Sequence, residues 1–265
     1  MTAPRRSTPS RRPLAALAAI VLVAAVAAGA YGVWYLFLKP AGPAAIANST
    51  LPPVPSSSAQ AAASSTSSSA AAPSSSGQVS GGIDGTWNVD PSIGSFSDFT
   101  SSFVGYRVQE ELGSIGANTA VGRTPNVTGS MTISGTQVTA ATITADLTTL
   151  QSDDDRRDGQ LRRQGLETQT FPTATFTLSS PIDLGGIPAD NKELTLTAKG
   201  QLMLHGQTKD VELPLKSRLS NGVVTVAGSL PIVFADYGIE KPRSFAVLSI
   251  ADQGTMELQL FFRKG

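Results

Sequence analysis

Residues 194–205 read Leu-Thr-Leu-Thr-Ala-Lys-Gly-Gln-Leu-Met-Leu-His. Small or apolar residues occupy every second position, and most of the residues between them are polar. A period of two is typical of a β-strand that turns one face to a core and the other to solvent. This segment therefore predicts a long, half-buried strand.

The same alternation continues toward the C-terminus. Apolar residues recur at 211, 213 and 215, then at 224, 226, 230 and 232, and finally at 256, 258, 260 and 262. We expect a turn at 205–209 and a two-residue turn at Asn221-Gly222. Pro214 has no amide hydrogen to give to a sheet, which predicts an edge position or a bulge there.

The N-terminal half of the domain shows shorter runs of the same kind, at 87–89, 104–108 and 131–133. One segment looks helical instead. It begins after Asp153-Asp154-Asp155, which can cap a helix N-terminus, carries Leu161 and Leu166, and should end near Gly165. Strands joined mostly by hairpins, with one short helix, predict an all-β antiparallel barrel of about eight strands, because closure removes exposed edges. A β-sandwich fits the same strand pattern and is the alternative.

The N-terminal segment predicts where this domain lies. Residues 13–38 carry no charge and follow Arg5, Arg6, Arg11 and Arg12. We expect a cytoplasmic tail over 1–13 and a transmembrane helix over 14–38, which exceeds the roughly 20 apolar residues needed to cross a bilayer. Basic residues stay on the cytoplasmic side, so the chain should be a single-pass protein of the cell membrane with its C-terminal domain extracytoplasmic, whether periplasmic or extracellular. A cleaved signal peptide ending at Ala28-Gly29-Ala30 is the alternative.

Between the predicted membrane segment and the barrel, residues 39–82 are rich in Ser, Ala and Pro. Such a composition buries little apolar surface, so we expect a disordered linker with an r.m.s. span of about 35–40 Å. The predicted barrel domain, 83–265, contains 15 of the 20 basic residues and all 20 acidic ones, a formal charge of −5 (15 − 20). This charge argues against a nucleic-acid partner. The chain has no cysteine, which excludes disulfides and a thiolate nucleophile.

Several short motifs resemble the YceI-like family and occur in its order. They are Ser102-x-Val104-Gly105-Tyr106-x-Val108, Arg157-Asp158-x-x-Leu161, Thr170-Phe171-Pro172-x-Ala174-x-Phe176, Gly200-x-Leu202-x-Leu204-His205-Gly206-x-Thr208-Lys209 and Asp236-Tyr237-Gly238-Ile239. The resemblance implies a lipocalin-like barrel, usually exported, that encloses a long apolar lipid such as a polyisoprenoid and has no established catalysis. No cofactor is predicted.

From the aromatic and large aliphatic residues we select a candidate apolar pocket. Its residues are Phe103, Tyr106, Phe171, Phe176, Leu202, Leu204, Phe234 and Tyr237. Arg156 and Arg157 are candidates for a phosphate or pyrophosphate head group, because a guanidinium offers bidentate donors. The simpler interpretation is that these arginines pair with the neighbouring aspartates.

His205 is the sole histidine, and no serine or carboxylate stands in a recognisable triad motif. We therefore expect it to support its turn and predict no catalytic residue. The aspartates at 153–158 do not match a calcium loop, since Arg157 and Gln164 fall at ligand positions, and no metal site is predicted. The favoured function is a membrane-tethered binding or carrier protein for an apolar, isoprenoid-type lipid. The alternative is a ligand-free envelope module that binds a protein or wall polymer, and the sequence identifies no protein partner.

Overall fold

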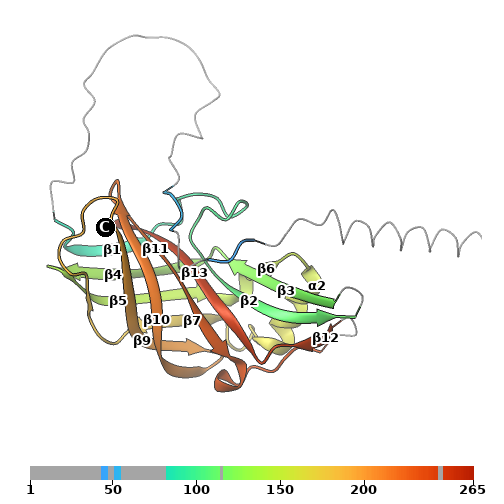
Figure 1. Cartoon of the computed structure of the whole chain (residues 1–265). Helices are drawn as coiled ribbons and strands as arrows, with labels where there is room; N and C mark the ends of the chain where they lie inside the picture. Colours follow the sequence, from blue (N-terminus) through green and yellow to red (C-terminus); the bar gives the residue numbers. More distant parts are fainter. Residues whose placement is uncertain (1–42, 47–50, 55–81, 114–115, 244–246) are drawn as a thin grey trace, which may run out of the picture. The chain divides into compact units, whose positions relative to one another are not determined.

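The computed structural model describes residues 43–46, 51–54, 82–113, 116–243 and 247–265 (Figure 1). The predicted tail (1–13) and transmembrane segment (14–38), and most of the predicted linker (39–82), lie outside these ranges. No helix in the described ranges is long and apolar enough to cross a membrane. The strands are β1 (Gly85–Val89), β2 (Phe103–Leu112), β3 (Gly116–Thr124), β4 (Val127–Ser134), β5 (Gln137–Asp146), β6 (Gln151–Ser152), β7 (Thr173–Leu178), β8 (Ile182–Asp183), β9 (Glu193–Leu204), β10 (Gln207–Ser220), β11 (Val223–Val233), β12 (Val247–Ile250) and β13 (Gln253–Lys264).

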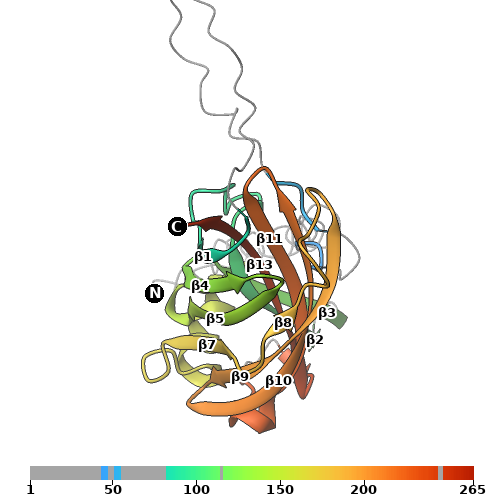
Figure 2. The ribbon, with the colours of Figure 1, turned by 90° about the vertical axis from the view of Figure 1, so that its left-hand side faces the viewer.

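Eight of these strands close into an antiparallel barrel, as the alternating pattern predicts. Their order around the ring is β1-β4-β5-β7-β9-β10-β11-β13, and β13 pairs back onto β1 (Figure 2). The barrel prediction is therefore confirmed.

Strand β13 joins the barrel to a smaller extension of the sheet. Along one edge it pairs with β11 from Gln253 to Arg263. Along the other edge, Thr255–Gln259 pair with β2, and only Phe262–Lys264 pair with β1. Strand β2 continues the sheet away from the ring through β3 and β6, and β12 pairs with its far end (Figure 1).

The predicted helix is present. It consists of α2 (Asp155–Gln160) and a following π-helical turn, η4 (Leu161–Gly165). Asp154 caps it by accepting hydrogen bonds from the amides of Arg156 and Arg157 at 2.8 and 3.3 Å. Short 3-10 turns η3 (Leu147–Thr149) and η5 (Phe234–Tyr237) complete the helical elements of the described residues.

Two hairpin turns show how local sequence sets register. Asn221 and Gly222 have φ values of 52° and 74°, the positive values that the predicted two-residue turn requires. The turn between β9 and β10 is shorter than expected, because His205 and Gly206 alone form it with φ values of 51° and 72°. Pro214 lies on β10 just before its pairing with β11 begins at Leu215, so its missing amide hydrogen costs no bond to β11.

Inward and outward faces of β13 are both buried, which the period-two pattern alone does not predict. Leu258, Leu260 and Phe262 point into the barrel. On the opposite face, Glu257 and Phe261 are 1% and 0% exposed. The loop before β2 and two pieces of the predicted linker, 43–46 and 51–54, cover this outer face.

Candidate functional site

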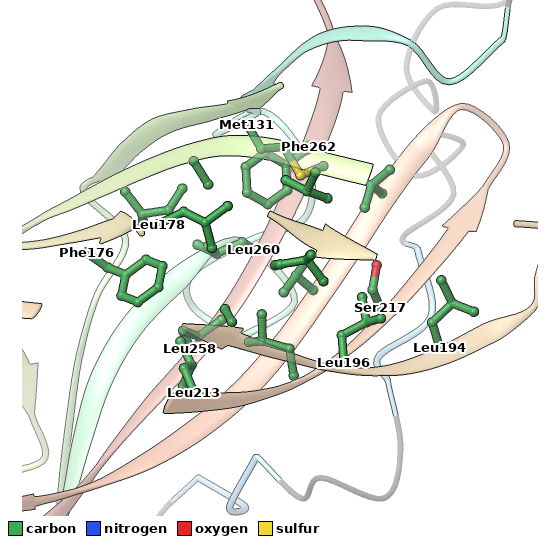
Figure 3. Close-up of a pocket in the computed structure, with 18 of the residues that line it drawn as sticks. Met131, Phe176, Leu178, Leu194, Leu196, Leu213, Ser217, Leu258, Leu260 and Phe262 are labelled. Carbon is green, nitrogen blue, oxygen red and sulfur yellow. The ribbon is translucent and has the colours of Figure 1, made fainter. Parts of the chain in front are cut away.

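The barrel encloses an apolar cavity (Figure 3). Its volume, measured as the space open to the centre of a water molecule, is about 130 Å³. One water needs roughly 10–15 Å³ on that measure, so the space exceeds that of a chance packing defect. The lining residues are Ile83, Val104, Met131, Ile133, Val138, Ala141, Ile143, Ala145, Ala174, Phe176, Leu178, Ile182, Leu184, Pro188, Leu194, Leu196, Ala198, Leu202, Leu213, Leu215, Ser217, Leu219, Val224, Val226, Met256, Leu258, Leu260 and Phe262.

Strand alternation builds this lining. Successive side chains of a strand point to opposite faces, so each wall strand supplies every second residue. Strand β9 contributes Leu194, Leu196, Ala198 and Leu202, and Figure 3 shows the side chains of facing strands converging on the same space. Most inward positions of these strands hold aliphatic residues, and the lining is therefore mostly aliphatic.

The two ends of the cavity differ. Among the described residues, Ser217 is the only one of the lining that has a polar side chain, and it lies with half-buried Leu194 at one end (Figure 3). Lining residues toward the other end, such as Leu202 and Leu213, are each 2% exposed. Beyond them Phe234 and Tyr237 of η5 pack into the barrel core and close that end. We call the Ser217 end the mouth.

The predicted pocket residues divide into two groups. Phe176 and Leu202 line the cavity. Leu204, Phe234 and Tyr237 are in the barrel core at the closed end and are not among its lining residues.

The remaining three aromatic candidates lie outside the cavity. Phe103 is on the outer side, where the Arg123 guanidinium sits 4.2 Å from its ring centroid. Tyr106 packs with Leu147 and Leu150 near η3. Phe171 packs against His205, with the ring centroids 4.4 Å apart and the ring planes tilted by 57°.

The arginine candidates are also away from the lining. Arg157 donates to Glu110 at 2.8 Å and to Asp153 at 2.5 Å, so it pairs with acidic residues as the simpler interpretation predicted. Burial alone would lower the pKa of Arg157, but the two carboxylates outweigh burial and raise it. Arg156 is exposed.

His205 supports the β9–β10 turn. Its Nδ1 lies 3.0 Å from the carbonyl oxygen of Tyr237, and its Nε2 lies 3.2 Å from Oε2 of Glu167. Both ring nitrogens thus hold neighbouring segments together, which agrees with the structural role expected for it.

Most of the lining was not selected from the sequence, although a signal for it was present. The inward positions of β9, β10, β11 and β13 are the apolar positions of the period-two pattern. The aromatic candidates mostly fill the closed end and the outer face. The aliphatic members of the pattern form the wall.

Several solved structures are similar to this chain. A polyisoprenoid-binding domain from Saccharophagus degradans, described as implicated in plant cell wall breakdown, is 21% identical and has a TM-score of 0.53, with 68% of this chain and 98% of that chain covered. BcnA of Burkholderia cenocepacia is 19% identical, with a TM-score of 0.48 and coverage of 60% and 95%. A YceI protein of Campylobacter jejuni is 14% identical, with a TM-score of 0.44 and coverage of 54% and 85%. A search of curated proteins found no match.

The family comparison covers most of the folded domain. The model of the YceI-like domain matches residues 87–262, which run from β1 to β13 and include nearly every residue of the cavity wall. The chain therefore belongs to the YceI-like family.

Proposed function

We propose that this protein binds an apolar lipid of isoprenoid type inside its barrel and carries or sequesters it. The observation that supports this most strongly is the cavity, whose lining, in the part of the chain that the structure describes, has one polar side chain, that of Ser217. The Saccharophagus degradans domain, which has the same fold, is described as polyisoprenoid-binding.

Burial supplies the binding energy in this proposal. Each methylene that leaves water contributes about 0.8 kcal/mol, so a long hydrocarbon binds without directional contacts. An apolar wall gives little preference among hydrocarbon chains. The hydroxyl of Ser217 favours an orientation in which the polar end of the lipid lies at the mouth.

The proposed site performs no chemistry. Within the described ranges, no acidic or basic side chain lines the cavity beside the hydroxyl of Ser217. A ligand-free envelope module is the less favoured alternative, because such a barrel would fill its interior with side chains.

We place the barrel outside the cytoplasm, tethered by the predicted transmembrane helix over 14–38. A tether keeps the binding site near a lipid source and raises its effective concentration there. N-terminal sequencing of the mature protein tests this part separately. Loss of about 30 residues would replace the anchor by a cleaved signal peptide.

Native mass spectrometry of the full chain, released gently from membranes, tests the lipid proposal. We expect a bound mass that organic extraction recovers as a lipid with a long hydrocarbon chain. A folded protein that carries no lipid and takes up no fluorescent prenyl probe would refute the carrier function.

A further inference from the structure

A buried ion cluster lies on the outer face of the sheet, apart from the cavity. Glu257 accepts from Arg107 Nε at 3.0 Å, and Arg123 Nη2 lies 3.4 Å from its other carboxylate oxygen. Glu257 is 1% exposed and Arg123 is 3% exposed. Buried charges are costly unless their remaining hydrogen-bonding groups find partners, so this cluster needs additional polar groups around it.

The main chain of residues 43–46 supplies those groups. Arg107 Nη2 donates to the carbonyl oxygen of Pro43 at 2.7 Å, and Arg123 Nη2 donates to that of Ala44 at 2.9 Å. The amide of Ile46 donates to Oε1 of Glu257 at 3.0 Å. Two carbonyls face the two cations and one amide faces the carboxylate, so each main-chain dipole meets the opposite charge.

A second contact follows along the chain. Leu51 is 2% exposed, and the carbonyl oxygen of Pro52 accepts from Arg218 Nη2 at 2.7 Å. Val54 packs on the cluster formed by Ile93, Val223 and Phe261. Residues 51–54 are therefore held by one arginine contact and by apolar burial. Residues 43–46 are held by three polar contacts at the ion cluster.

From these contacts we infer that the outer face of the barrel is a docking site for the chain's own residues 43–46 and 51–54. The linker is then held against the barrel near the end of the linker that follows the membrane helix. This consequence rests on the proposed anchor over 14–38. Five residue steps separate Leu38 from Pro43, which span at most about 17 Å. A free linker would have an r.m.s. span of about 35–40 Å. The docked barrel would thus stay much closer to the bilayer than a barrel on a free linker.

Hydrogen–deuterium exchange on the full chain tests the docking. Ile46→Pro removes the amide hydrogen that Glu257 accepts, whereas the control Ile46→Ala keeps it. We expect the Ile46 amide of the wild type and the Leu51 amide of Ile46→Ala to exchange about ten- to a hundred-fold more slowly than free amides. Ile46→Pro should expose Leu51 to exchange and leave the amides of β4 and β5 unchanged. Free exchange at Ile46 in the wild type would overturn the inference, as would protection that depends on protein concentration.

The membrane consequence has its own readout. Because the chain has no cysteine, Lys209→Cys provides a single dye position on the exposed β9–β10 hairpin. In nanodiscs, energy transfer from the dye at position 209 to a dye on the lipid measures the distance from the barrel to the bilayer. This distance should be longer and more broadly distributed for Ile46→Pro than for Ile46→Ala. Equal distances would overturn the inference that docking keeps the barrel near the membrane. A protein that does not enter nanodiscs would refute the anchor, while the exchange data still decide the docking.

Discussion

The ring of Phe176 lies over Gly200, so that a Cβ atom on Gly200 would come within 2.5 Å of the ring's Cζ atom. The two residues belong to the neighbouring strands β7 and β9. A residue without a side chain on one strand thus makes room for an aromatic ring from the next. Gly200 therefore leaves no empty volume at its inward position, because the ring of Phe176, a residue of the cavity wall, occupies it.

Replacing Gly200 by Ala should destabilise the barrel by about 1–3 kcal/mol, because the added methyl group overpacks the wall. The carbonyl oxygen of Thr177 also lies against this position and cannot move without disturbing the sheet. Urea unfolding measures the effect, with Gln201→Ala on the exposed face of the same strand as the control. An unchanged free energy of unfolding would mean that the Phe176 ring does not occupy the space beside Gly200.

Tyr106 should tolerate loss of its hydroxyl. Within the described residues, its Oη atom is buried and has no hydrogen-bond partner, and burial raises the pKa of the phenol. An unpaired buried polar atom costs about 1–3 kcal/mol, so Tyr106→Phe should be neutral or more stable by up to that amount. Thermal unfolding measures this, and Tyr106→Leu, which loses the ring, should be destabilised. A less stable phenylalanine variant would show that the hydroxyl is hydrogen-bonded.

Asp90 should contribute to acid sensitivity. Burial on its own would raise the pKa of Asp90, but hydrogen bonds from Ser92 and the charge of Arg263 outweigh it and hold the pKa below 3.8. A carboxyl whose pKa is lowered by folding stabilises the native state above its unfolded pKa, and this contribution is lost as the pH falls through the folded value.

Asp90→Asn should therefore be less stable than the wild type at pH 7, and the difference should narrow below pH 3.8. Urea unfolding at several pH values measures it, with the exposed Asp210→Asn as a matched change of charge. If the difference in free energy of unfolding between Asp90→Asn and the wild type stayed constant from pH 7 to below pH 3.8, the effect of Asp90 would not come from its charge.

Most of the fold could be predicted from local pattern. Alternation over 194–204 and 224–232 identified long strands, Asn221-Gly222 identified a turn, and the aspartates at 153–155 located the start of the helix. These signals succeed because each depends on residues close together in the chain. Closure of the ring was favoured because it removes exposed edges, but the strand pattern alone fits a sandwich as well.

The site was harder to predict, for a physical reason. Alternation tells which residues share a face, but it does not tell what covers the other face. Phe103 looked like a cavity residue, yet it is buried on the outer side beneath Arg123. Glu257 and Phe261 are buried by segments that are remote in sequence. Which part of a barrel stays empty depends on side chains from many strands together, and no single segment encodes it.

The central claim is that the lumen admits an apolar chain, and one titration tests it directly. Ala141 lines the cavity, whereas the adjacent Ala140 is exposed on the same strand, β5. Binding of a fluorescent prenyl lipid is measured for the wild type, Ala141→Phe and Ala140→Phe, with folding checked by circular dichroism. We predict that Ala141→Phe weakens binding at least about tenfold, since about 1.4 kcal/mol of lost burial suffices, and that Ala140→Phe binds as the wild type does. Equal binding by all three folded proteins would contradict a ligand inside the barrel.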